Sequence, residues 1–406
     1  MNTGNKDYTK KSIEQKYLGN RGLLILTAFL SAFIPLSTDL YLPSLPLMTQ
    51  SFHTTSTLVN LTIILFFAFF ALGTLFWGPL SDKYGRRKIL LTGLVMYTAS
   101  SILCAVSGNI YQLILFRVLQ AVASGASTAV ATAIVKDVYE GRRRESILAV
   151  VQSMAMVAPI IAPVIGALVL KVTSWRGVFW ILAVLGLIAA IGGILLQETI
   201  RERYKGSTFR SLGQLAVVIK NPGFSSLLVT FFLINIPYMA FITASSYIYV
   251  EGFGLSEQVF SYFFAFNASF ALIGPLLYIQ LSNHLRRNSI IICCFCIISL
   301  SGILILIFGS IKPWLFALLL MPATLSVGII RPPSANLMLE QQRENIGAAS
   351  SLMGFVNTFF GCIGMLLISL GSGSRITIIG IMYAVTALCG LMLWRFFHKK
   401  PFIKQI

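Results

Sequence analysis

Charged side chains are scarce in this chain of 406 residues. Asp, Glu, Lys and Arg together make up 11% of it, whereas soluble domains carry about 25%. Hydrophobic residues make up 56%, and the mean hydropathy is +0.83. Stretches of about 20 apolar residues recur along the whole length, and each is long enough to cross a bilayer as a helix. The alternating pattern of a transmembrane barrel is absent, so we predict an all-α membrane protein.

Acidic residues and histidines are fewer still, with 13 Asp and Glu and 3 His. A membrane-embedded enzyme would need clustered His or carboxylates at membrane depth, and only Asp39 is available there. No phosphate-binding loop of the form G-x-x-x-x-G-K-[ST] occurs, so we do not expect ATP as the energy source. Cys293-Cys294-x-Cys296 has no His or carboxylate nearby and indicates packing rather than a metal site. The sequence therefore predicts neither an enzyme nor a bound cofactor.

The net charge of +18 comes from Lys and Arg, which gather in alternate loops and at the two chain ends. This is the positive-inside pattern of membrane proteins, and it argues against nucleic acid as a partner. It predicts that both termini of a multi-pass membrane protein lie on the cytoplasmic side.

Twelve spans are expected, in two six-helix bundles. The expected spans are residues 22–45, 57–80, 89–106, 110–135, 146–171, 177–197, 224–249, 258–281, 289–309, 314–339, 347–370 and 376–397. The longest polar break divides the chain, so we predict a tail (1–21), a first bundle (22–197), a cytoplasmic linker (198–222), a second bundle (223–397) and a tail (398–406). The halves carry a faint repeat, because residues 80–87 return as 281–287 with Asn283 in place of Asp82.

The polar turn between the second and third spans, residues 78–90, reads G-P-L-S-D-K-Y-G-R-R-K-I-L. Gly78 lets a neighbouring helix approach closely, and Gly85 permits a tight turn. Asp82 is expected to bind the free amides of a nearby helix start. Arg86 and Arg87 hold the turn on the cytoplasmic side. A loop that only sets topology is the alternative.

Two charges lie inside the first and fourth spans, where each costs several kcal/mol. At 1.5 Å per residue, Asp39 lies about 26 Å from the cytoplasmic face and Arg117 about 10 Å from the outer face, so the two could meet. We hypothesise that Asp39 binds and releases a coupling proton and that Arg117 is its partner. The alternatives are that Asp39 caps the break before Pro43 and that Arg117 is a structural hydrogen-bond centre.

The fifth span contains Pro159, Pro163 and Gly166 among small residues. Paired prolines and small side chains predict a bendable helix that packs closely on a neighbour. Packing alone is the alternative explanation.

These stretches together resemble the major facilitator superfamily. Residues 78–90 look like its loop between helices two and three, with Lys83 where Arg is more usual. Leu113, Arg117 and Gln120 resemble the helix-four motif of proton-coupled members, and residues 158–167 resemble the antiporter motif with Ala at three Gly positions. With residues 38–43 and Trp175-Arg176, they resemble the bicyclomycin-resistance and chloramphenicol/florfenicol exporters, mainly in the first half of the chain.

The resemblance implies a monomeric drug:proton antiporter, driven by the proton gradient, that exports small, largely apolar drugs by alternating access. It also implies that the 78–90 loop is a conformational latch in which Asp137 pairs with Arg86 in the outward-open state. A metabolite facilitator or symporter of the same fold is the alternative.

A substrate cavity is expected between the halves, near mid-membrane. Aromatic, Met and amide side chains suit apolar, uncharged or weakly cationic compounds. The candidates are Tyr41, Gln120, Gln152, Met154, Asn235, Tyr238, Asn267 and Asn357. Arg331 is expected to reach the cytoplasmic interface instead.

Overall fold

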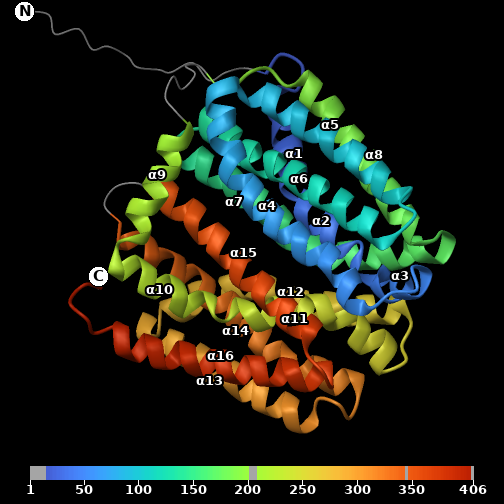
Figure 1. Ribbon diagram of the computed structural model, residues 1–406. Helices are drawn as coiled ribbons and strands as arrows, with labels where there is room; N and C mark the ends of the chain where they lie inside the picture. Colours follow the sequence, from blue (N-terminus) through green and yellow to red (C-terminus); the bar gives the residue numbers. More distant parts are fainter. Residues whose placement is uncertain (1–14, 201–207, 343–345, 404–406) are drawn as a thin grey trace, which may run out of the picture.

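The computed structural model describes residues 15–200, 208–342 and 346–403, and the described parts are helical with short connections (Figure 1). The first half contains α1 (Gly19–Ser31), α2 (Phe33–Asp39), the 3₁₀ turn η1 (Leu42–Ser44), α3 (Leu45–Ser51), α4 (Ser56–Tyr84), α5 (Arg86–Ala105), α6 (Ile110–Val138), α7 (Gly141–Val172) and α8 (Trp175–Leu195). The second contains α9 (Thr208–Ile219), α10 (Pro222–Phe232), α11 (Asn235–Ser246), the π-helical segment η2 (Tyr247–Gly252), α12 (Glu257–Ser282), α13 (Arg287–Phe308), α14 (Pro313–Glu340), α15 (Ile346–Leu370) and α16 (Arg375–Phe397).

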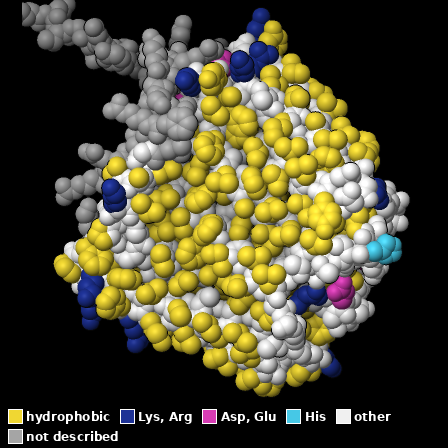
Figure 2. Space-filling view, viewed as in Figure 1, with side chains coloured by type: hydrophobic (Ala, Val, Ile, Leu, Met, Phe, Trp, Pro, Cys, Tyr) yellow, Lys and Arg dark blue, Asp and Glu magenta, His cyan; other side chains and the backbone are white. Residues whose placement is uncertain are grey.

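Twelve helical stretches of the described chain are long and apolar enough to cross a membrane, which confirms the predicted number of spans. The first runs from Gly19 to Ser51 and the seventh from Pro222 to Gly252, and both are interrupted. Figure 2 shows the matching surface: hydrophobic side chains cover most of the visible face, and Lys and Arg lie toward its edges.

The helices form two layers, α1–α8 and α10–α16, which Figure 1 shows one above the other. The layers meet where α15 packs on α4 and where α12 packs on α7. Gln15 donates a hydrogen bond to the Gln197 carbonyl (3.4 Å), so the start of the first span lies beside the end of the sixth. We call this end of the molecule, where α9 also lies, the terminal end, and the other the opposite end.

The two layers are structural repeats of each other at the crossing of their second and fourth helices. In the first, a Cβ placed on Gly125 of α6 would lie 3.0 Å from the Gly73 backbone of α4. In the second, a Cβ placed on Gly274 of α12 would lie 2.6 Å from the Gly328 backbone of α14. The second and fourth helices of each bundle therefore cross backbone to backbone at matching glycines.

A second pair of matching contacts fixes the register between the repeats. A Cβ on Gly166 of α7 would overlap the carbonyl oxygen of Leu40, and one on Gly364 of α15 would overlap that of Ile236. The fifth helix of each bundle thus presses on the interrupted first helix of the same bundle. Leu40 corresponds to Ile236, and the residues before them, Asp39 and Asn235, also correspond.

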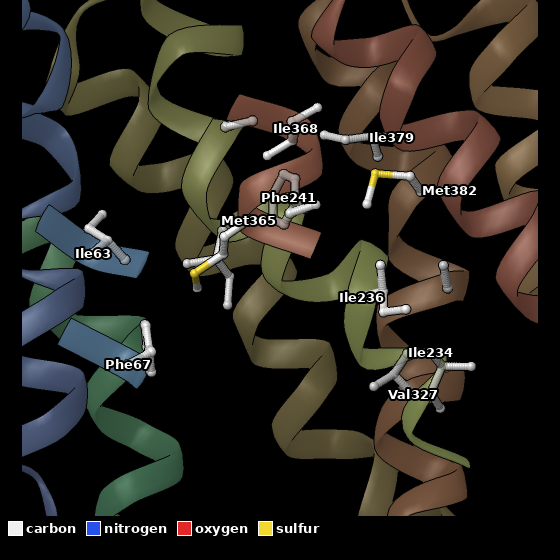
Figure 3. Packing of buried hydrophobic residues seen from close by; sticks show 14 of the residues in the cluster. Ile63, Phe67, Ile234, Ile236, Phe241, Val327, Met365, Ile368, Ile379 and Met382 are labelled. Atoms are coloured by element: carbon white, nitrogen blue, oxygen red, sulfur yellow. The ribbon is translucent and has the colours of Figure 1, made fainter. Parts of the chain in front are cut away.

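The contact between the layers is apolar near its centre. Ile63 and Phe67 of α4 face Met365 of α15 across it, with Phe241 of α11 close behind (Figure 3). Among the described residues, the hydrogen bonds that join the layers all lie toward the opposite end. They include Asn60 Nδ2 to Ser369 Oγ (2.9 Å).

The segment predicted as a linker, 198–222, contains a helix. Residues 201–207 lie outside the described part, but Thr208–Ile219 forms helix α9, which contacts α15 and α4.

Candidate functional site

A cavity of about 290 Å³ lies between the two layers. The first layer contributes α1, α2, α4, α6 and α7 to its wall, and the second contributes α11, α12 and α14. Five of the site residues predicted from the sequence line it: Asp39, Gln152, Pro159, Tyr238 and Asn267. Phe67, Phe241 and Phe264 add aromatic surface, so the wall is mainly apolar with a few polar groups.

Asp39 is the last residue of α2 and is 6% exposed on the cavity wall. The Thr38 hydroxyl donates a hydrogen bond to Asp39 Oδ1 (3.0 Å). Among the described residues no Lys, Arg or His lies within ion-pair distance of this carboxyl group. An acid without a cationic partner at membrane depth is expensive, which makes Asp39 a candidate functional residue.

The expected pairing of Asp39 with Arg117 is not formed in this conformation. Arg117 is fully buried and donates from Nη1 to the Ser37 carbonyl (3.0 Å) and to Gln120 Oε1 (2.7 Å). Ser37 and Asp39 are two residues apart on α2, so their side chains point about 200° apart around the helix. The Ser37 hydroxyl meets the Tyr97 hydroxyl (2.5 Å) inside the first bundle, while Asp39 faces the cavity.

Aromatic rings surround the Arg117 guanidinium in place of a carboxylate. Its centre lies 4.2 Å from the Phe66 ring centroid, 5.0 Å from that of Tyr41 and 5.8 Å from that of Phe179. Its Nε and Nη2 have no hydrogen-bond partner. Cation–π attraction is worth about 2 kcal/mol or more when desolvated, and it offsets part of the burial cost. Here the residue acts as a structural centre of the first bundle.

Several candidates for the cavity wall lie elsewhere. Tyr41 is buried in the first bundle with its hydroxyl 2.6 Å from that of Thr62, and Gln120 donates to Ser101 (2.7 Å). Both were expected to face the cavity, but the packing around Arg117 turns them inward.

Three further candidates are also absent from the cavity wall. Asn235 is 3% exposed and donates to the Asn357 carbonyl (2.6 Å), which ties α11 to α15. Met154 is 43% exposed on α7.

Arg331 corrects another expectation, because it lines the cavity instead of reaching the interface. Its guanidinium lies 5.3 Å from the ring centroid of Tyr238. The predicted span 314–339 already included Arg331, and α14 runs through the Pro332-Pro333 pair to Glu340.

The turn between α4 and α5 brings most of the expected latch residues together. Arg86 Nε lies 2.9 Å from Asp137 Oδ2 on α6, and its Nη1 lies 2.5 Å from Asp82 Oδ1. Gly85 has φ 104°, a backbone conformation that side chains rarely adopt, as a tight turn requires. Arg87 Nη2 donates to the Ile194 carbonyl (2.8 Å). The cluster fastens α4, α5, α6 and α8 of one bundle.

Two details of this turn differ from expectation. A Cβ on Gly78 would meet nothing within 4 Å, so no helix packs closely there in this conformation. Asp82 pairs with Arg86, and Glu198 binds the helix start instead. The Oε1 atom of Glu198 accepts hydrogen bonds from the backbone amides of Arg86 (2.9 Å) and Thr199 (3.1 Å).

The fifth span connects the antiporter-like motif to the cavity. Pro159 lines the cavity, and Gly166 presses on the Leu40 carbonyl, next to Asp39. Pro163 lies between them on the same helix, α7. The motif therefore supports the part of the first span that carries the buried acid.

The fold and the cavity between its two bundles define a membrane transporter of small molecules rather than an enzyme. The sequence profile described as Major Facilitator Superfamily matches residues 27–367, and the chain belongs to this family.

Similar proteins agree with this assignment. The bicyclomycin resistance protein homolog of Haemophilus influenzae is 26% identical over 356 residues, covering 84% of this chain and 87% of that protein. The chloramphenicol resistance protein of Pseudomonas aeruginosa is 33% identical over 183 residues, 45% of this chain and 43% of that protein. The crystal structure of a D-xylose–proton symporter, 13% identical, superposes with a TM-score of 0.73 over 92% of this chain and 97% of that chain, which shows the shared fold.

Proposed function

We propose that this protein is a proton-coupled antiporter that exports small, largely apolar drugs, of chloramphenicol or bicyclomycin type, across a bacterial inner membrane. Drug-resistance relatives and the mainly apolar cavity support an exporter of drugs. The proton gradient drives transport without a cofactor, and the working unit is a monomer. The position of Asp39 is the observation that carries the proposal.

Asp39 can serve drug and proton alternately because it lies on the wall of the cavity itself. An ionised carboxylate there is stabilised when a polar or cationic drug contacts it, and a neutral one is stabilised when the cavity is apolar and empty. Drug binding and proton binding therefore compete for one group, which is the requirement for exchange. Arg117 holds the same helix through the Ser37 carbonyl, so it can transmit a shift of α2 into the bundle.

Alternating access follows from the contact between the layers. Hydrogen bonds between the layers lie toward the opposite end, whereas Gln152 and Arg331 on the cavity wall are exposed. With the basic loops on the cytoplasmic side, the terminal end is cytoplasmic and this conformation is open inward. The Arg86–Asp137 latch is already paired in it. We therefore propose that the latch acts by docking on the second bundle at Gly78 when the terminal end closes.

The experiment measures protons released when chloramphenicol is added to the detergent-purified protein in weak buffer with a pH indicator. We expect release from the wild type and none from Asp39→Asn. Asp82→Asn, which removes a carboxyl group outside the cavity, is the matched control and should release as the wild type does. Equal release from Asp39→Asn and the wild type would refute proton exchange at this residue.

A further inference from the structure

The cavity contains one acidic and one basic side chain, and each comes from a different bundle. Asp39 belongs to α2 of the first layer, and Arg331 belongs to α14 of the second. Among the described residues no carboxylate lies within ion-pair distance of Arg331. Arg331 is exposed on the cavity wall, and the described contact of its guanidinium is with Tyr238, through the face of the ring (5.3 Å) and through the hydroxyl group.

The repeat shows that the fold does not require this charge. Gly328 of α14 corresponds to Gly125 of α6, because each lies at the glycine crossing of the second and fourth helices of its bundle. Three residues further along each helix, Arg331 corresponds to Thr128, which also lines the cavity. The first bundle packs with a neutral side chain where the second carries a guanidinium, so the charge is available for a ligand.

The chemistry of a guanidinium selects the ligand group. Arg presents a planar fork of donors that matches a carboxylate in a bidentate pair. Tyr238 lies against Arg331 on the same wall and adds a hydroxyl group near that fork. Phe67, Phe241 and Phe264 supply room for an aromatic body, and Asp39 can accept from a basic nitrogen on the other side.

We propose that Arg331, with Tyr238, binds an acidic group of the substrate, so that this exporter accepts amphoteric compounds whose basic end faces Asp39. The inference rests on the proposed function and narrows its substrate class, which the sequence alone restricted to apolar, uncharged or weakly cationic drugs. A substrate held at both ends bridges the two bundles, because its anchors belong to different layers.

The test uses equilibrium dialysis of purified protein with two probes, the zwitterionic quinolone norfloxacin and its ethyl ester. The ester keeps the aromatic body and the amine but lacks the carboxylate. We expect the wild type to bind the acid about 10- to 100-fold more tightly than the ester, as for a hydrogen-bonded charge pair. Arg331→Gln should remove that preference and change ester binding less than twofold, and Arg331→Lys should keep part of it.

Arg395→Gln, an exposed change on α16, is the matched control and should preserve the preference. Chloramphenicol, a neutral probe, separates the two proposals. If the wild type binds chloramphenicol but binds acid and ester equally, or if Arg331→Gln weakens both equally, the inference on Arg331 is wrong. If the wild type binds neither chloramphenicol nor the quinolones, the proposed drug export fails and the inference fails with it.

Discussion

Gly166→Ala should destabilise the protein although alanine is the better helix former. An added methyl group at this position would overlap the Leu40 carbonyl oxygen, and backbone cannot rotate away as a side chain can. Forcing extra atoms into a packed contact costs about 1–3 kcal/mol. The gain in helix propensity from Gly to Ala is at most about 1 kcal/mol. The overlap therefore outweighs the propensity.

Gly354→Ala gives the matched reference, because a Cβ on Gly354 of α15 meets nothing within 4 Å. It keeps the propensity gain and lacks the overlap. Each kcal/mol shifts the melting temperature by about 2–4 °C for a unit of 150–250 residues. We expect Gly166→Ala to melt about 2–12 °C below Gly354→Ala in the same detergent.

Gly364→Ala separates stability from coupling. Its Cβ would overlap the Ile236 carbonyl in the equivalent contact of the second bundle, so its melting temperature should fall by a similar amount. Only Gly166→Ala displaces the residue that follows Asp39. Drug-induced proton release, measured below both melting temperatures, should fall in Gly166→Ala and persist in Gly364→Ala. A Gly166→Ala protein as stable as Gly354→Ala would refute the packing argument.

Two further predictions follow from contacts at the two ends of the molecule. Asn60→Ala removes the bond to Ser369 that joins the layers and should favour opening at the opposite end by about 0.5–1.5 kcal/mol. Its readout is maleimide labelling of Cys362, which lies at the α4–α15 contact, in a variant without the other cysteines. Labelling should be faster than in the wild type for Asn60→Ala but not for Asn288→Ala, which loses a bond to Trp394 within one bundle. Equal labelling rates in Asn60→Ala and the wild type would contradict the prediction. Glu198→Ala removes the acceptor at the start of α5 and should lower stability by about 1–2 kcal/mol in thermal unfolding, with partial recovery in Glu198→Gln, whose amide oxygen still accepts. An unchanged melting temperature in Glu198→Ala would show that water replaces the carboxylate.

The sequence predicted the spans for a physical reason that is local, whereas the Arg86–Asp137 pair was implied by the family resemblance. Apolar runs of bilayer length leave the backbone little choice but helix. Arg86 begins α5 and Asp137 lies near the end of α6, so the short connection between these two helices brings both residues to the same level. The role of Gly85 could also be predicted, because a tight turn between two long helices requires a residue that is free to adopt a positive φ.

Helix rotation is what the sequence could not supply. The sequence placed Asp39 and Arg117 at compatible depths. In the structure, however, Arg117 binds the carbonyl of Ser37, while Asp39, two residues further along α2, faces the cavity. Tyr41 and Gln120 were misplaced for the same reason. A hydrophobic span has weak amphipathicity, because lipid and protein interior are both apolar, and so the pattern does not show which face is which.

The two repeats give an internal test of whether Asp39 merely supports the break in the first span. Its counterpart Asn235 is buried and uses its amide to bond the Asn357 carbonyl, which joins the first and fifth helices of the second bundle. In the first bundle the same two helices pack through Gly166 against Leu40, and among the described residues the Asp39 carboxyl group accepts a hydrogen bond only from its neighbour Thr38. If Asp39 were needed to hold the first and fifth helices together, its side chain would bond the fifth helix as the side chain of Asn235 does. Asp39 instead leaves its carboxyl group on the cavity wall, and this difference between otherwise equivalent positions favours a role in binding over a role in packing.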